Sequence, residues 1–91
     1  MNNYSYPLLS GLSNEEISIL IDLWVAVEEA YEDQIRAEKF LEKYQAFKRL
    51  VPSKVEEKQL GKEFEERSGY SLYQVVQLAN TADSKAVLHV D

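Results

Sequence analysis

The segment from residue 14 to residue 33 has too much apolar surface for a helix that stands alone. At about 100° per residue, its apolar side chains cover most of the circumference of a helix. They are Ile17, Leu20, Ile21, Leu23, Trp24, Val25, Val27 and Tyr31, widened by Ile19, Ala26 and Ala30. The polar strip is narrow and consists of Ser18, Asp22, Glu29 and Asp33. Such a helix is surrounded by other elements, so we expect this segment to be the centre of the fold.

Three serines each precede an apolar-periodic segment and are followed three residues later by Glu or Gln. The pairs are Ser13 with Glu16, Ser53 with Glu56, and Ser71 with Gln74. This spacing is typical of a capping box, in which the hydroxyl and the returning side chain satisfy backbone N–H groups at the start of a helix. The boxes predict helices over about 14–33, over about 54–67, and from 72 into the low eighties.

A fourth helix is expected over about 37–50, because one face of this segment is apolar and Pro52 disfavours helix at the residue before it. Its start is open, and Asp33 is one candidate cap. The helix over 54–67 has a thin apolar stripe and is expected to be peripheral; the stripe consists of Val55, Leu60 and Phe64. The buried face of the last helix is predicted to contain Leu72, Val75, Val76, Leu78, Ala79 and Ala82.

The 91 residues fit a single domain. Residues 1–12 are expected to form an extended arm, with Tyr6–Pro7 packed across the helices. Residues 84–91 either fray or dock through Val87, Leu88 and Val90. The predicted fold is therefore all-α: a compact bundle of about four helices around the first, with an extended N-terminal arm.

The amino-acid composition limits which catalytic and metal-binding sites the chain can form. The chain has no Cys and one His, His89, so no disulfide, thiolate ligand or cysteine nucleophile is available, and neither a metal site nor a cofactor is expected. No glycine-rich loop or nucleophile–base set is evident, so we expect no enzyme. The uncharged apolar run 17–21 is far too short to span a bilayer, and no basic residue precedes an apolar stretch at the N-terminus. A cytoplasmic protein is expected.

Glu28 lies within the apolar arc of the first helix, between Trp24 and Tyr31 on the helical wheel. A carboxylate there must be paired, lie at an exposed helix end, or have a raised pKa. We interpret it either as a structural pair with a Lys, Arg or Tyr hydroxyl, or as an anchor for a cationic partner.

Basic side chains gather on the second and third predicted helices. They are Arg36, Lys39 and Lys43 on one flank of the former, and Lys54, Lys58 and Lys62 on one face of the latter. These residues indicate either a patch for an anionic partner or solvated faces with intrahelical pairs such as Lys62–Glu66 and Glu63–Arg67. The net charge of −6 weighs against nucleic acid as that partner.

Tyr70 and Tyr73 flank the cap residue Ser71. Tyrosine is enriched at interfaces because it joins apolar area to a hydroxyl. These side chains therefore either form an interaction surface or seal the domain's own core.

Several segments together resemble a known family. They are Tyr6-Pro7, Ser13-Asn14-Glu15-Glu16, Val51-Pro52-Ser53-Lys54, and Lys62-Glu63-Phe64 leading to Ser68-Gly69-Tyr70-Ser71-Leu72-Tyr73. Their order and spacing are similar to uncharacterised protein family 0223 of low-GC Gram-positive bacteria. The resemblance implies a compact all-α domain from a bacterial cytoplasm. It implies no activity, catalytic residue or cofactor.

Two hypotheses for function follow from the residues. The first is a non-enzymatic module that binds a protein partner or itself, supported by the tyrosines and by the seven carboxylates of residues 13–34 against the basic flank that follows. The second is an anion or nucleic-acid binder that uses the basic patch, with Arg36, Lys39, Lys43, Lys54 and Lys58 as its contacts.

Overall fold

The computed structural model describes residues 4–83 and 85–90, and over these residues it contains four helices and two short strands. The helices are α1 (Asn14–Glu32), α2 (Ala37–Leu50), α3 (Lys54–Ser68) and α4 (Leu72–Thr81). The strands are β1 (Ile35–Arg36) and β2 (Val87–Leu88). The predicted all-α architecture is confirmed, with this two-stranded sheet as an addition.

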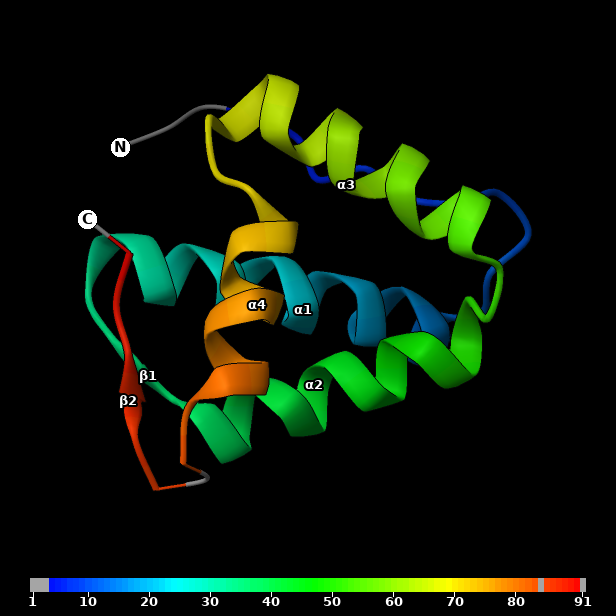
Figure 1. The fold of residues 1–91 in the computed structure, drawn as a ribbon. Helices are drawn as coiled ribbons and strands as arrows, with labels where there is room; N and C mark the ends of the chain where they lie inside the picture. The colour runs from blue at the N-terminus through cyan, green and yellow to red at the C-terminus, as the bar shows by residue number, and fades with distance from the viewer. Residues whose placement is uncertain (1–3, 84, 91) are drawn as a thin grey trace.

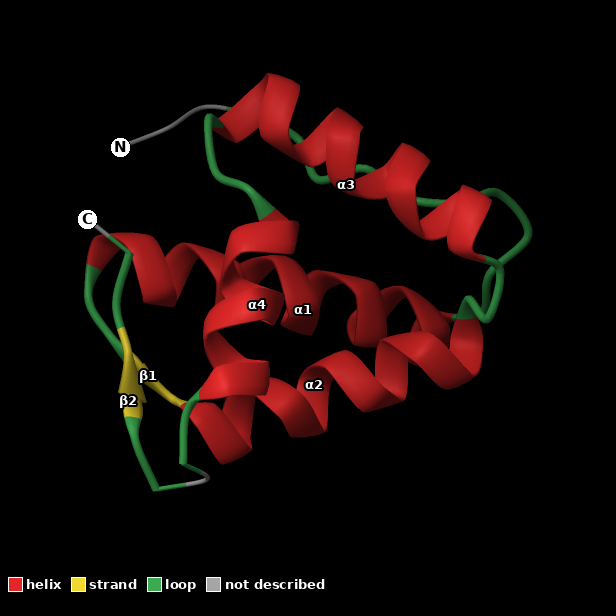
Figure 2. Cartoon of the chain, viewed as in Figure 1, coloured by secondary structure: helices red, strands yellow, loops and turns green. Residues whose placement is uncertain are grey.

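The other three helices are arranged around α1 (Figure 1). Figure 1 shows α1 and α2 side by side and antiparallel, with α3 on the opposite side of α1. From the end of α3, α4 runs across α1 toward α2 and packs against all three other helices. The two strands pair at the end of the molecule where α1 leads into α2 (Figure 2).

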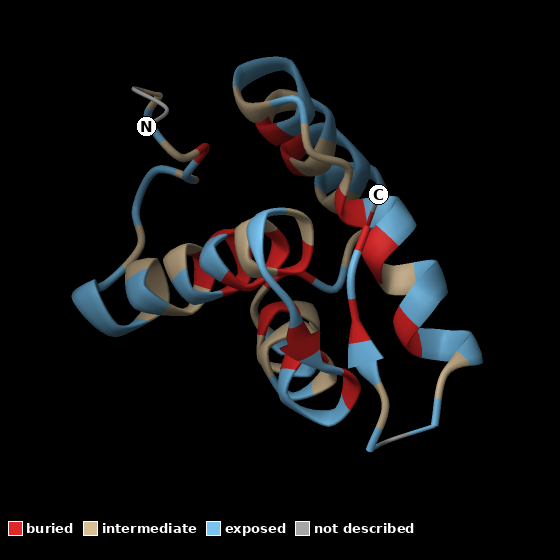
Figure 3. Cartoon of the chain, turned by 90° about the vertical axis from the view of Figure 1, so that its left-hand side faces the viewer, coloured by how far each residue is buried: buried red, intermediate tan, exposed pale blue. Residues whose placement is uncertain are grey.

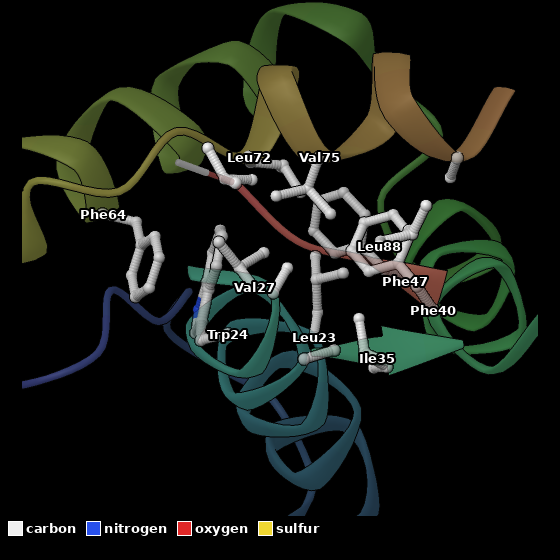
Figure 4. Packing of buried hydrophobic residues seen from close by; sticks show 14 of the residues in the cluster. Leu23, Trp24, Val27, Ile35, Phe40, Phe47, Phe64, Leu72, Val75 and Leu88 are labelled. Atoms are coloured by element: carbon white, nitrogen blue, oxygen red, sulfur yellow. The ribbon is translucent and has the colours of Figure 1, made fainter. Parts of the chain in front are cut away.

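The core lies between these helices, and α1 supplies its centre. Leu20, Trp24 and Val27 are fully buried, as expected for a helix that others surround. The Trp24 ring stacks on Phe64 of α3, with ring centroids 4.6 Å apart. Figure 4 shows these rings meeting Val27 and the side chains of α4, which include Leu72 and Val75. Figure 3 shows that the outward faces of the helices are exposed.

The serine caps explain where three helices begin. At α1 the box is complete: Glu16 N donates to Ser13 Oγ at 3.2 Å, and Ser13 N donates to Glu16 Oε1 at 2.9 Å. Ser53 and Ser71 accept from the N–H groups of the residues three positions later, both at 3.3 Å. The predicted starts of α1, α3 and α4 are therefore confirmed.

Two predictions of buried side chains were wrong. Val55 is 74% exposed and Leu78 is 38% exposed. Val55 lies nine residues before Phe64, which places it about 180° away on the helical wheel, so the face that buries Phe64 turns Val55 to solvent. Leu78 lies at the edge of the stripe formed by Leu72, Val75 and Ala79 on the helical wheel, so its side chain is only partly covered.

The C-terminal segment docks instead of fraying over residues 85–90. β2 pairs antiparallel with β1, with Ile35 opposite Leu88 and Arg36 opposite Val87. The Val90 N–H donates to the Ala30 carbonyl at 2.8 Å. Of the two alternatives for the tail, docking is the one observed, while residues 84 and 91 lie outside the described part.

The same segment also satisfies the start of α2. The cap residue Arg36 makes no side-chain capping bond, and Asp33 ends α1 instead of starting α2. The Ala37 N–H donates to the Ala86 carbonyl at 2.8 Å. A backbone group from the far end of the chain therefore takes the place of a capping side chain.

The N-terminal arm packs on α1 and α3, as predicted for Tyr6–Pro7. Pro7 is fully buried, and Trp24 Nε1 donates to its carbonyl oxygen at 3.0 Å. Arg67 Nη1 donates to the Ser5 carbonyl at 3.0 Å. Residues 1–3 of the predicted arm lie outside the described part. In that part no helix combines the length and the hydropathy needed to cross a membrane.

Candidate functional site

A groove of about 410 Å³ lies where α2, α3 and α4 meet, and we call it the α3–α4 groove. α2 contributes Tyr44 and Lys48 to its lining. The other lining residues are Lys54, Glu57, Lys58, Gly61, Lys62 and Glu65 of α3, and Ser71, Leu72, Tyr73 and Val76 at the start of α4. Its volume is within the range of pockets that hold ligands.

One wall of the groove is apolar. It consists of Leu72, Val76 and the ring of Tyr73, which is 68% exposed. The Tyr73 hydroxyl accepts from Gln77 Nε2 at 2.8 Å, and this bond holds the ring on the surface of α4. Gly61 adds no side chain to the groove, and a Cβ atom built there would lie 3.7 Å from Leu72 Cδ2.

Three lysines of α3 line the groove at a spacing of four residues. Lys54, Lys58 and Lys62 are all exposed. Among the residues that the structure describes, no carboxylate oxygen lies within 4.0 Å of their Nζ atoms. The expected pair of Lys62 with Glu66 is therefore absent over that part of the chain, whereas Arg67 pairs with Glu63 at 4.0 Å.

The helix ends add to this positive charge. α3 begins at Lys54 and α4 begins at Leu72, and both residues line the groove. The N-terminus of a helix carries a partial positive charge because its first N–H groups point outward. The row of lysines and the two helix starts make this groove a favourable place for carboxylates, although the whole chain has a net charge of −6.

At the α2 side, Tyr44, Lys48 and Glu57 form a cluster that joins α2 to α3. The Tyr44 hydroxyl donates to Glu57 Oε2 at 2.6 Å, and Lys48 Nζ donates to Glu57 Oε1 at 2.5 Å. Burial, followed by the hydrogen bond to Glu57 and its negative charge, raises the pKa of Tyr44 well above its usual value. Tyr44 therefore stays protonated as a donor, and both Glu57 oxygens are used in holding the two helices together.

Glu28 lies under the N-terminal arm. Its two oxygens accept hydrogen bonds from the hydroxyls of Tyr4 and Tyr6, the latter at 2.7 Å. Burial first, then the bond to Glu28 and the charges of Glu28 and Glu32, raises the pKa of Tyr6 to about 12. Of the two interpretations of Glu28, the structure shows the pairing with tyrosine hydroxyls.

The structure does not bring the basic residues together into one patch. Arg36 lies 3.7 Å from Glu38, and Lys43 lies 3.8 Å from Asp22 of α1. Lys39 is exposed on α2. None of these three lines the α3–α4 groove, whereas Lys54 and Lys58 do.

The two candidate tyrosines have different surroundings. The Tyr70 ring stacks on Tyr31 with centroids 4.5 Å apart, and its hydroxyl donates to Glu32 at 2.7 Å. The Tyr31 hydroxyl in turn accepts from the Ser71 N–H at 3.0 Å. Tyr70 therefore fastens the loop before α4 to α1, while Tyr73 is exposed in the groove.

Sequence reasoning identified only part of the groove. Its candidate interaction residues did not include Tyr44, Lys48, Glu57 or Glu65, and it assigned Val76 to the buried face of the last helix. Tyr44 and Lys48 are four residues apart, which places them on one face of α2, but no periodicity indicates that α3 folds back over that face. The turn at Val51–Pro52–Ser53 is the available signal, and it predicts a change of direction without its angle.

Other features of the surface have fewer charged or reactive side chains than the α3–α4 groove. A wider depression of about 870 Å³ lies over α4 and the residues that follow β2, and none of the described residues that line it is Lys, Arg, Asp or Glu. His89 Nδ1 lies 2.5 Å from the Asp33 carbonyl oxygen, so the N–H at this position donates to it. Within residues 4–83 and 85–90, no group of three or more His, Cys, Asp or Glu side chains is placed to hold a metal ion.

Comparison with known proteins identifies the family. The sequence model of an uncharacterised protein family, UPF0223, matches residues 3–88. A UPF0223 protein of Streptococcus sanguinis (strain SK36) is 52% identical over 79 residues, which cover 87% of this chain and 86% of the relative. A UPF0223 protein of Streptococcus gordonii is 48% identical over 81 residues, with coverages of 89% and 88%.

A UPF0223 protein of Streptococcus pneumoniae (strain CGSP14) is 53% identical over 76 residues, which cover 84% of this chain and 83% of the relative. The resemblance inferred from the motifs is thereby confirmed. The family is described as uncharacterised, so its name brings no activity, substrate or partner to this chain. The chain belongs to the bacterial protein family UPF0223.

Proposed function

We propose that this chain is a small, non-enzymatic protein-interaction module of the bacterial cytoplasm, with the α3–α4 groove as its docking surface. One observation carries the proposal: three exposed lysines of α3 stand beside an apolar wall, with no carboxylate of the described residues within 4.0 Å. In a chain with a net charge of −6, an uncompensated positive row is the feature that selects a partner.

The composition of the groove matches the anatomy of a protein interface. Such interfaces have an apolar centre with aromatic residues and a polar rim. Here Leu72, Val76 and Tyr73 supply the apolar area, and the lysines supply the rim. An exposed tyrosine ring is a suitable anchor, because it buries a large area with few rotatable bonds.

The titratable groups of the groove support a binding role over a catalytic one. A general base must be deprotonated near neutral pH before it can accept a proton from a substrate. The raised pKa of Tyr44 keeps its hydroxyl protonated instead. Glu57 accepts from Tyr44 and Lys48 at once, so its carboxylate is held in place as a link between α2 and α3.

A second candidate is an anion or nucleic-acid binder, favoured by the lysine row and the two helix N-termini. Glu65 lines the same groove, is exposed, and would repel a phosphate backbone at that end. The apolar wall also has no counterpart in a phosphate ligand. For these two reasons we favour a protein partner over an anion or a nucleic acid.

The test is affinity capture from a lysate of the native host, with three forms of the chain compared side by side. The groove variant carries Lys58→Glu and Lys62→Glu. The control carries Lys39→Glu and Arg49→Glu, which change the charge equally on the exposed face of α2, outside the groove. A protein retained by the wild type and the control and lost from the groove variant is expected. Equal retention by all three forms, or retention of nucleic acid only, contradicts the proposal.

A further inference from the structure

We infer that the partner segment in the α3–α4 groove is an α-helix with an apolar stripe and carboxylates spaced four residues apart. This inference rests on the proposed function and adds the shape and the chemistry of the partner. It follows from the layout of the charges, from the secondary structure of the groove walls and from the place of the acidic side chains.

The positive charges form a line and do not converge on a point. Lys54, Lys58 and Lys62 follow one another at four-residue intervals along α3, so their Cα atoms are about 6 Å apart from one to the next. A small anion meets at most part of such a line. A helix lying along α3 repeats the same rise, because carboxylates four residues apart are also about 6 Å apart along its axis.

The walls of the groove favour a helix over an extended segment. All described residues that line it belong to α2, α3 or α4, or cap α4, so no strand edge is present in its lining. An extended peptide that binds by strand addition needs such an edge to pair its backbone N–H and C=O groups. A helix satisfies its own backbone and offers side chains alone to the apolar wall of Leu72, Val76 and Tyr73.

The acidic side chains limit where the partner's carboxylates lie. Glu57 is already neutralised by Lys48, at 2.5 Å. Glu65 lines the groove beyond Lys62 and is exposed, so it disfavours a further carboxylate at that end. The favoured pattern is therefore up to three carboxylates opposite Lys54, Lys58 and Lys62, with the apolar stripe turned toward α4.

Synthetic peptides test this pattern directly. The probe is a fluorescein-labelled peptide of about 18 residues, long enough to form a helix, with a leucine stripe beside three glutamates at four-residue spacing. One comparison peptide has the same composition in an order that breaks the stripe. A second carries Lys in place of each Glu. Fluorescence anisotropy is expected to show saturable binding of the first peptide only.

Charge reversal in the protein locates the site. Lys58→Glu with Lys62→Glu is expected to weaken binding of the glutamate peptide about tenfold or more and to create binding of the lysine peptide. The Lys39→Glu and Arg49→Glu control is expected to change either affinity by less than about twofold, since neither residue lines the groove. Gly61→Leu keeps every charge and fills the groove, and it too is expected to abolish binding.

Several results would overturn the inference. They are equal binding of the ordered and the rearranged peptides, equal weakening by the groove and control variants, and binding that survives Gly61→Leu. Displacement of the peptide by inorganic phosphate or by oligouridylate at comparable charge concentration would show an anion site instead. If the peptides fail while affinity capture still yields a groove-dependent protein, the helix inference falls and the proposed function stands.

Discussion

Glu28 is a carboxylate within the apolar arc of α1. The N-terminal arm supplies the hydrogen-bond donors that this carboxylate needs there. Both of its oxygens accept from tyrosine hydroxyls of the arm. Glutamine is neutral and offers one acceptor oxygen where glutamate offers two, so both hydroxyls lose a charged partner and one of them also loses its acceptor oxygen. We expect Glu28→Gln to lower the free energy of unfolding by about 1 kcal/mol in urea titrations. Glu29→Gln, on the polar strip, is the control and should change it little.

The raised pKa of Tyr6 predicts a loss of stability at alkaline pH. The folded chain holds this proton up to a pH of about 12, whereas an unfolded tyrosine releases it near pH 10. The contribution is complete below about pH 10 and is lost as the pH rises toward about 12. Unfolding measured at intervals across this window should show a decline that is shallower in Tyr6→Phe. Tyr73→Phe, at an exposed ring, should keep the slope of the wild type.

The sequence predicts where Glu28 lies on α1, but it does not predict which residues pair with it. The helical wheel places it in the apolar arc, because that follows from spacing alone. The two tyrosines that pair with it are 22 and 24 residues away. Their contact depends on the path of an irregular arm, and no periodicity describes such a path.

At the scale of the element, two glycines of one helix should respond in opposite ways to alanine. Gly61 lies inside α3, and a Cβ there has ordinary contact with Leu72, so Gly61→Ala is expected to stabilise the fold by about 0.5–1 kcal/mol. Gly69 caps α3 with φ of +82°, so Gly69→Ala is expected to destabilise it by about 1 kcal/mol. Thermal and urea unfolding of the two variants give the comparison, and the same sign for both would contradict it.

The helices could be predicted and the strands could not, for one physical reason. Ser13, Ser53 and Ser71 act within three residues, so their caps are visible in the sequence. β1 and β2 have two residues each and pair across about fifty positions. A two-residue strand has no alternation to detect. The start of α2 depends on the Ala86 carbonyl, which no capping pattern indicates.

At the scale of the whole molecule, β2 ties the end of the described chain to the corner between α1 and α2. Leu88 is 3% exposed and Val87 is 51% exposed, so an alanine substitution at Val87 is the control for one at Leu88. Leu88→Ala should leave a cavity and lower the free energy of unfolding by about 2–4 kcal/mol, while Val87→Ala should cost well under 1 kcal/mol. Hydrogen exchange at the Ala37 amide, which donates to Ala86, should accelerate in Leu88→Ala alone. Equal effects of the two substitutions would mean that the segment is not held in this way.

Only the lysines on the α3 side of the groove and Tyr73 of α4 could be predicted from the sequence. Lys54, Lys58 and Lys62 share a face by spacing, and the sequence shows that face without its surroundings. What makes it a groove is the placing of α2 and α4 beside it, which depends on long-range packing of Phe64 and Leu72 in the core. Of the basic residues of α2, Lys48 lines the groove, whereas Lys43 pairs with Asp22 of α1 and lies outside it.

The sequence contains a single tryptophan, and its indole touches the arm and α3 at once, through the bond to Pro7 and the stack on Phe64. The fluorescence and the circular dichroism of this side chain therefore report two separate events. Release of the N-terminal arm would expose the indole N–H of Trp24 to water and shift its fluorescence emission to longer wavelengths. Separation of α3 from α1 would remove the stacked ring of Phe64 and change the near-ultraviolet circular dichroism. Trp24 is therefore an intrinsic probe for a ligand that disrupts the contact with the arm but not the contact with α3, or the reverse.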